Sequence, residues 1–332
     1  MFLAYTVYSL QLESAVIRFL GILLLALMAH GANAGEYPNR PITLIVPFGG
    51  GSGTDTVARI VANRLSEVLN SPIVIDNRVG ANGAIAAATA ARAAPDGYTL
   101  MAGGVSTHAA NPSLMKSIQY DPKADFVPIS ELGIFPYFLI TSPDIQAGNV
   151  KELVAQSKAK PGTFSFAYGN AIGQLAGEML KRRTSADLLA VPYKSSPAAI
   201  TDLLAGRVSI MFVDMTAALS QVKAGQLKAL ATTTQERTAL FPDLPSMKES
   251  GVDLFDITAW TGFFAPKNTP PDIVALLAGA LHKVMEEPEV RSSLAQVGFE
   301  AKWAGPSAFG EHVAHDLDLW VHLTQEAGIE KQ

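Results

Sequence analysis

Short apolar runs alternate with helix-periodic segments along most of the chain, and this alternation is the strongest constraint on the fold. Residues 42–47 (ITLIVP) predict a buried strand, and the segment after Thr54 places Val57, Val61 and Leu65 on one face of a helix. Such alternation is typical of α/β proteins with a parallel, doubly wound sheet. Further strands are predicted at 72–76, 98–102, 164–167, 189–193, 208–213 and 227–232, with an extended segment at 256–264.

The alternating segments form two blocks of similar order, separated near residue 142, and the tail after them is poor in predicted strands. The tail helices are predicted at 271–286, 288–297 and 307–327. This order indicates a second lobe inserted into the first, with the tail helices returning to cover the first. Lobe 1 is predicted at 35–141 plus 262–332, and lobe 2 at 142–261. Because open α/β sheets bind ligands beyond the carboxyl ends of their strands, a central cleft between the lobes is the expected site.

The composition fits two folded lobes and excludes several classes of function. The chain has 332 residues, of which 48% are hydrophobic and 17% charged, which argues against extensive disorder. Nucleic-acid binding usually needs a basic face, and a formal net charge of −5 gives no reason to expect one, so we expect no nucleic-acid partner. The absence of cysteine excludes disulfides, thiolate nucleophiles and cysteine metal sites, and it suits an oxidising compartment.

The N-terminus has the pattern of a secretory signal. Arg18 precedes an apolar run from Phe19 to Ala29, and Ala32-Asn33-Ala34 follows as an A-x-A cleavage pattern. The run is shorter than the roughly 20 residues that span a bilayer. We therefore predict a signal peptide at 1–34, a mature chain beginning near Gly35, and a periplasmic location; the alternative is a buried or anchoring N-terminal helix.

The most distinctive local motif follows the first predicted strand, at residues 47–55 (PFGGGSGTD). Glycines let the backbone approach a ligand closely, and the helix that follows begins with unpaired N–H groups at the positive end of its dipole. This combination suits a carboxylate or phosphate, although an ordinary tight turn would have the same pattern. The candidate ligand-binding residues here are Phe48, Gly49, Gly50, Gly51, Ser52, Gly53, Thr54 and Asp55.

This loop does not match the enzyme motifs that it most nearly resembles. A P-loop needs a Lys after the last glycine, and none is present. The dinucleotide fingerprint has Thr56 in place of its third glycine, and a nucleophile elbow around Ser52 has Thr54 in place of its last. We expect a binding protein rather than an enzyme, with a periplasmic hydrolase using Ser52 or Ser106 as the rival class.

Three other polar segments follow predicted strands. Residues 168–173 are the equivalent turn of the second block, 103–108 form a third loop, and Asp214 ends an apolar strand. Asp214 is expected either to face the cleft or to cap a helix, and His108 either to donate to a carboxylate or to be structural. The candidates from these segments are Tyr168, Gly169, Asn170, Gly173, Ser106, Thr107, His108 and Asp214.

No metal or cofactor site is predicted. His312 and His315 lie three residues apart on a predicted helix, but two histidines make a poor metal site and no H-E-x-x-H motif is present. We interpret them as residues of a solvated helix face. Trp260 is interpreted as core or hinge packing.

A set of motifs in order resembles one family. These motifs are 37–42 (YPNRPI), Val46-Pro47-Phe48 with the glycine-rich loop, 76–83 (DNRVGANG), 95–100 (PDGYTL), 191–194 (VPYK), 241–245 (FPDLP) and 265–270 (APKNTP). Together they are similar to the Bug/TctC family, the extracytoplasmic solute receptors of tripartite tricarboxylate transporters. The similarity runs from about residue 36 to residue 330.

The resemblance implies a type II-like Venus-flytrap fold, a carboxylate ligand and a two-subunit membrane permease as partner. It implies that backbone amides and bridging waters hold the ligand, with Phe48 to Asp55 on one side and Tyr168 to Gly173 on the other. By position, Ser106-Thr107-His108 and Asp214 carry over as well. Many members have a longer second-lobe loop ending in His-Leu, where this chain has Gln174-Leu175, and many have Pro at the position of Gly49.

We therefore expect a monomeric, periplasmic solute-binding protein without a cofactor. A carboxylate would meet the amides of Gly51 to Asp55, and the second-lobe turn would close over the other end of the solute in a hinge motion. A β-branched residue at Gly51 or Gly53 should weaken binding with little loss of folding. A solute sensor for a signalling partner is a third alternative, and the sequence leaves the identity of the acid open.

Overall fold

The computed structural model describes residues 37–331 except 254 and 256, so the predicted signal peptide at 1–34 lies outside the described residues. Ten strands form a single sheet in this part of the chain. They are β1 (Ile42–Val46), β2 (Ile73–Asn77), β3 (Thr99–Gly104), β4 (Phe126–Thr141), β5 (Ser165–Tyr168), β6 (Leu189–Pro192), β7 (Ile210–Asp214), β8 (Lys228–Thr232), β9 (Thr258–Pro266) and β10 (Glu300–Ala304).

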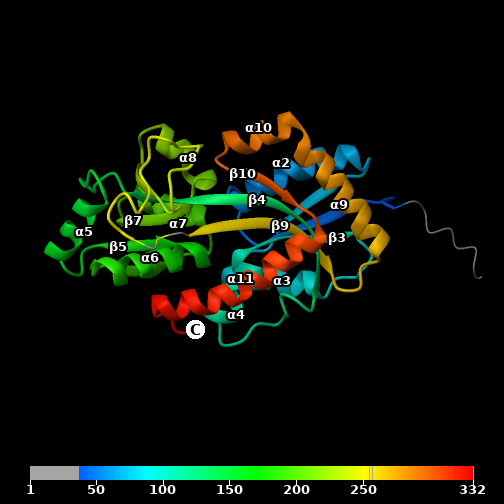
Figure 1. Ribbon diagram of the computed structural model, residues 1–332, viewed down its shortest axis with the longest axis horizontal. Coiled ribbons are helices and arrows are strands. Elements are labelled where there is room, and N and C mark those ends of the chain that lie inside the picture. The colour runs from blue at the N-terminus through cyan, green and yellow to red at the C-terminus, as the bar shows by residue number, and fades with distance from the viewer. Residues whose placement is uncertain (1–36, 254, 256, 332) are drawn as a thin grey trace, which may run out of the picture. The chain divides into compact units, whose positions relative to one another are not determined.

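Helices connect most of these strands and cover both ends of the sheet (Figure 1). In the described residues they are α2 (Gly53–Val68), α3 (Ala84–Ala91), α4 (Asn111–Leu114), α5 (Val150–Ala159), α6 (Ala171–Thr184), α7 (Ser196–Leu204), α8 (Met215–Lys223), α9 (Pro271–Glu286), α10 (Pro288–Gln296) and α11 (Pro306–Ala327). Two short turns complete the set, a 3₁₀ turn η2 (Ala81–Gly83) and a π-helical turn η3 (Ser106–Ala110).

The sheet contains two parallel groups of the same design. Eight strands follow the order β2-β1-β3-β9-β4-β7-β5-β6, and β8 and β10 each pair with β4 outside this order. β1 pairs in parallel with β2 and β3, and β5 pairs in parallel with β6 and β7. Each group follows the order second-first-third along the chain, so the carboxyl ends of β1 and β5 occupy equivalent places in the two groups. This confirms the predicted two-lobed α/β class.

Two long antiparallel strands join the groups. β9 pairs with β3 and with the first part of β4, whereas the last part of β4, from Tyr137 to Thr141, pairs with β7. Figure 1 shows β4 and β9 side by side through the middle of the sheet. The partner of β4 therefore changes between Pro136 and Tyr137, upstream of residue 141. The predicted lobe boundaries after residues 141 and 261 stay predictions.

The helices pack against the rest of the fold through their apolar faces. In α2, Val57, Val61 and Leu65 are fully buried, as the helical spacing predicts, and this helix packs against α9 and α10. α11 lies over β4, η3 and α6, so it contacts elements of both groups. In the second group, α7 and α8 bury a cluster centred on Phe138, Leu203, Met211 and Val213. None of the described helices is both long enough and apolar enough to cross a membrane.

Several elements were not predicted. β4 contains Pro128, Gly133 and Pro136 and has register shifts against β9, so its sequence lacks a regular strand pattern. β10 lies in the tail that was predicted to be poor in strands, and it pairs with β4. These strands form through pairing between segments far apart in the chain, and local patterns carry little information about such pairing.

Candidate ligand-binding site

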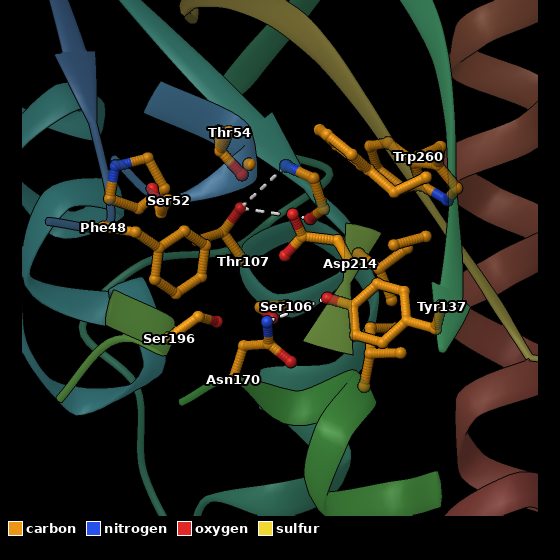
Figure 2. Close-up of a pocket in the computed structure, with 17 residues that line it drawn as sticks. Phe48, Ser52, Thr54, Ser106, Thr107, Tyr137, Asn170, Ser196, Asp214 and Trp260 are labelled. Carbon is orange, nitrogen blue, oxygen red and sulfur yellow. Dashed lines mark hydrogen bonds between the residues drawn. The ribbon is translucent and has the colours of Figure 1, made fainter. Parts of the chain in front are cut away.

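A small cavity of about 30 Å³ lies where β1, β3, β5 and β7 end (Figure 2). This volume takes roughly one or two water-sized groups, so a larger solute needs the walls to move apart. The walls come from both parallel groups and from β4 and β9. The lining residues are Pro47, Phe48, Ser52, Gly53, Thr54, Gly104, Val105, Ser106, Thr107, Phe135, Tyr137, Asn170, Ile172, Ser196, Asp214, Ala259 and Trp260.

The first wall is the N-terminus of α2. Ser52 is the N-cap: its backbone is extended and its hydroxyl accepts a hydrogen bond of 3.3 Å from the Asp55 N–H. The backbone N–H groups of Gly53 and Thr54, both lining residues, have no partner in the described structure. They are therefore available to a ligand in the cavity.

The second wall is the N-terminus of α6. Asn170 is the N-cap, and its side-chain oxygen accepts a hydrogen bond of 2.9 Å from the Gly173 N–H. Its amide nitrogen donates to the Tyr137 hydroxyl at 2.8 Å, which fixes the side chain against β4. The Ala171 N–H faces the Ser106 hydroxyl at 3.4 Å, a long contact, and the Ile172 N–H has no partner among the described residues.

A third helix, which was not among the predicted site segments, begins at the same cavity. α7 starts at Ser196, which is buried and lines the cavity. Its backbone N–H also has no partner in the described residues. Together with Gly53, Thr54 and Ile172, this makes four unpaired backbone donors at three helix N-termini. Unpaired N–H groups at helix N-termini, together with the helix dipoles, favour an anion at such a place.

Asp214 caps a helix, which is one of the two alternatives from the sequence, and it also lines the cavity; its role as a ligand contact stays a prediction. It is 5% exposed, and its side chain accepts a hydrogen bond of 3.0 Å from the Ala217 N–H at the start of α8. Burial raises the pKa of Asp214 to about 6, although the Ala217 hydrogen bond acts in the opposite direction. Figure 2 places its carboxylate among the other labelled residues of the cavity.

Asp55 does not line the cavity but orders the loop that does. Its carboxylate accepts hydrogen bonds from the Gly51 N–H at 3.0 Å, from Arg59 at 2.9 Å and from Asn77 at 2.8 Å. Burial raises the pKa of Asp55, but these hydrogen bonds and the Arg59 charge outweigh it, so the pKa lies below the ordinary value. Asp55 is thus a positioning residue for the glycine-rich loop, in which Gly51 has a φ of +80°.

We expect Asp55→Ala to unfold at a lower temperature and to bind ligand more weakly. The loss leaves the Gly51 and Asn77 donors without their acceptor, at a cost of about 2–3 kcal/mol. Because the folded pKa is lowered, the stabilisation by Asp55 is present at neutral pH and is lost as pH falls. Thermal unfolding at neutral and acidic pH measures this, with the difference from wild type shrinking in acid. An equal difference at both pH values would contradict the role assigned to the ionised carboxylate.

His108 lies away from the cavity. Its ring is fully buried, stacked on Phe264 at a centroid distance of 3.8 Å and edge-on to Phe126. Burial lowers the pKa of His108 to about 3, so the ring is neutral over the physiological range. Its Nδ1 lies 2.9 Å from the Thr107 hydroxyl. This environment matches the structural alternative, in which the ring packs in the core and does not contact a ligand in the cavity.

A second, outer pocket of about 410 Å³ shares Asn170 with the cavity. It is lined by Ala81, Asn82, Leu114, Met115, Tyr168, Gly169, Asn170, Gln174, Pro192, Tyr193 and Lys194. Tyr168 and Gly169 from the predicted set therefore lie in this pocket. Gly49, Gly50, Gly51 and Gly173 line neither pocket, and Gly173 donates its N–H to the cap side chain of Asn170.

Trp260, a residue of β9, forms part of the cavity wall and is anchored on its other side by α11. It is 4% exposed, and its indole N–H donates to the Asp316 carboxylate of α11 at 2.6 Å. His312, one turn before Asp316, contacts Glu131 at 3.0 Å. His312 is therefore part of a packed polar cluster rather than of a solvated face. No group of three or more possible metal ligands occurs in the described part of the chain.

The two serines considered as nucleophiles make no hydrogen bond to a base in the described structure. Ser52 Oγ accepts the cap hydrogen bond, and Ser106 Oγ faces the Ala171 N–H. No histidine is among the described residues that line the cavity. Hydroxyl groups placed in this way can accept hydrogen bonds from N–H groups or donate them to an anion, whereas an activated nucleophile donates its hydrogen bond to a base.

The two parallel groups, the antiparallel strands that join them and the cavity between helix N-termini define the two-lobed class of periplasmic binding proteins. A match to one protein family narrows this class of protein further. The model of the tripartite tricarboxylate transporter family receptor (TctC) matches residues 57–329. The chain belongs to this family, whose members are solute-binding proteins, as the resemblance of the sequence motifs implies.

Three relatives illustrate the similarity. Protein BugT from Bordetella pertussis is 37% identical over 305 residues, covering 91% of this chain and 93% of BugT. An R. palustris protein solved with adipate is 31% identical with a TM-score of 0.87, covering 90% of this chain and 100% of its own. MatC from Rhodopseudomonas palustris, solved with bound malate, is 31% identical with a TM-score of 0.82, covering 86% of this chain and 99% of its own.

Proposed function

We propose that this protein is a periplasmic receptor that binds a small carboxylate-bearing solute in the cavity and delivers it to a membrane permease of the tripartite tricarboxylate type. The observation that carries the proposal is the set of four unpaired backbone N–H groups at Gly53, Thr54, Ile172 and Ser196. The two similar proteins solved with adipate and malate support a carboxylic acid as the ligand class.

Backbone donors suit a solute that must be released again. Each charge-assisted hydrogen bond contributes about 1.5–3 kcal/mol, so several around one carboxylate support micromolar affinity, about −8 kcal/mol. The small cavity volume requires the walls to separate for entry. A hinge motion on β4 and β9, the strands that join the two parallel groups, would provide this.

A thermal-shift screen over a library of carboxylic acids tests the ligand class, because a solute that binds only the folded protein raises its unfolding temperature. We expect one or a few acids to raise it by several degrees and to show micromolar Kd in titration calorimetry. The methyl ester or amide of each acid, which lacks the anion, should have no effect. A library without hits, or equal shifts with the esters, would contradict the proposal.

Delivery to a permease and export through the signal at 1–34 are tested in cells. We expect the protein in the periplasmic fraction and loss of uptake of the identified acid in a deletion strain. If uptake is intact but a transcriptional response to the acid is lost, the sensor alternative is favoured instead. Turnover of an ester or amide that Ser52→Ala abolishes would favour the hydrolase.

A further inference from the structure

Asp214 is an unusual lining residue for a cavity that suits an anion. No lysine, arginine or histidine is among the described residues lining the cavity, and Asp214 is the one acidic residue there. A ligand carboxylate in this cavity therefore meets backbone donors on one side and another carboxylate on the other. The cost of placing two anions together decides which acids can bind.

The neighbours of Asp214 leave its charge without a countercharge. It is 5% exposed and makes no ion pair in the described structure. Ala217 donates to it, and Tyr137 is its register partner on the adjacent strand β4. Burial and the Asp214 charge raise the pKa of Tyr137, so the phenol is neutral. A buried carboxylate with so few donors gains from any donor that a ligand supplies.

The donors and the acceptor lie on different elements. The N-termini of α2 and α6 are capped by the neutral side chains of Ser52 and Asn170, and α7 has no side-chain cap. The N-terminus of α8 is capped by the carboxylate of Asp214. Gly53 brings the two sides together: a Cβ atom on Gly53 would lie 2.1 Å from the Asp214 Oδ1. A ligand at Gly53 is therefore also beside Asp214.

We propose that Asp214 selects carboxylic acids that carry an ammonium or hydroxyl donor close to the carboxylate, in preference to unsubstituted acids of the same length. This inference rests on the proposed function and names the class of acid. The carboxylate takes the N–H groups of α2, α6 and α7, while the adjacent donor reaches Asp214. An ammonium group also supplies the missing positive charge, so it ranks above a hydroxyl group.

Matched acids that differ only in this substituent test the proposal by titration calorimetry on the full-length mature protein at neutral pH. Aspartate, malate and succinate form one series, and glutamate, 2-hydroxyglutarate and glutarate form a longer one. We expect affinity to fall in that order within the series that binds, by about tenfold or more from the amino acid to the unsubstituted acid. Succinate or glutarate as the tightest ligand would overturn the proposal while leaving the carboxylate-binding function intact.

The Asp214→Asn variant distinguishes ligand selection by the Asp214 charge from a purely structural role of this side chain. The amide retains the cap of α8 but carries no charge, so we expect the amino acid to bind about tenfold more weakly and the unsubstituted acid to bind more tightly. A purely structural role would weaken all three acids alike, which would overturn the proposal. Should no acid of the library bind the wild type, the proposed function itself fails, and this inference with it. The ranking of the wild-type ligands stands independently of how the variant folds.

Discussion

Gly53→Ala is expected to lower ligand affinity at least about a hundredfold while the protein still folds. The added Cβ atom would lie 2.1 Å from Asp214 Oδ1, 2.7 Å from its Cγ and 3.1 Å from Phe135 Cε1. Asp214 cannot simply swing aside, because its side chain caps α8. The α2 N-terminus must therefore move away from the wall formed by β4 and β7, and the donors no longer converge on one carboxylate.

The matched control is Gly279→Ala. Gly279 lies on the exposed side of α9, and a Cβ atom there meets nothing within 4 Å. We expect unchanged affinity and a slight stabilisation, up to about 1 kcal/mol, because alanine has the higher helix propensity. Titration with the same acid measures both variants. Binding by Gly53→Ala at wild-type affinity would show that the close approach of Gly53 to Asp214 is irrelevant to the bound state.

Asp214→Asn is expected to make the ligand-free protein more stable at neutral pH by up to about 3 kcal/mol. The folded protein holds the proton of Asp214 more tightly than the unfolded chain does, because burial raises the pKa from 3.8 to about 6. The stability that this group contributes is therefore present in acid and is lost as pH rises through about 6. Asparagine keeps the cap hydrogen bond and removes the buried charge.

Denaturant unfolding of both proteins across this pH range measures the effect. The difference between variant and wild type should be small near pH 4 and should grow up to about pH 7. The same substitution at the exposed Asp243 serves as the control for removing an aspartate charge at the surface. A variant that is less stable at neutral pH, or a difference independent of pH, would contradict the burial of an ionised carboxylate at the site. A residue that lowers the folding stability of the ligand-free protein is typical of functional sites.

The local parts of the site could be predicted from the sequence. The glycine-rich segment after β1 and the turn after β5 were recognised because a strand, a polar turn and the start of a helix are adjacent in the chain. The structure places Ser52, Gly53, Thr54 and Asn170 together in the cavity. Their role as ligand contacts stays a prediction that the titrations above test.

Other parts depend on contacts between distant segments. Tyr137 and Phe135 reach the cavity on β4, whose prolines and bulges hide the strand pattern. The packing of His108 is decided by Phe126 and Phe264, which follow it by many residues. Ser196 had a usable signal: it follows the predicted strand at 189–193, directly before a proline that begins a helix.

The crystal structure of the protein with its tightest acid tests the central claim most directly. We expect the carboxylate oxygens within about 3.2 Å of the backbone nitrogens of Gly53 or Thr54 and of Ile172 or Ser196, with no lysine or arginine in contact with them. A carboxylate bound instead to Lys194 in the outer pocket, with these four N–H groups facing water, would contradict it.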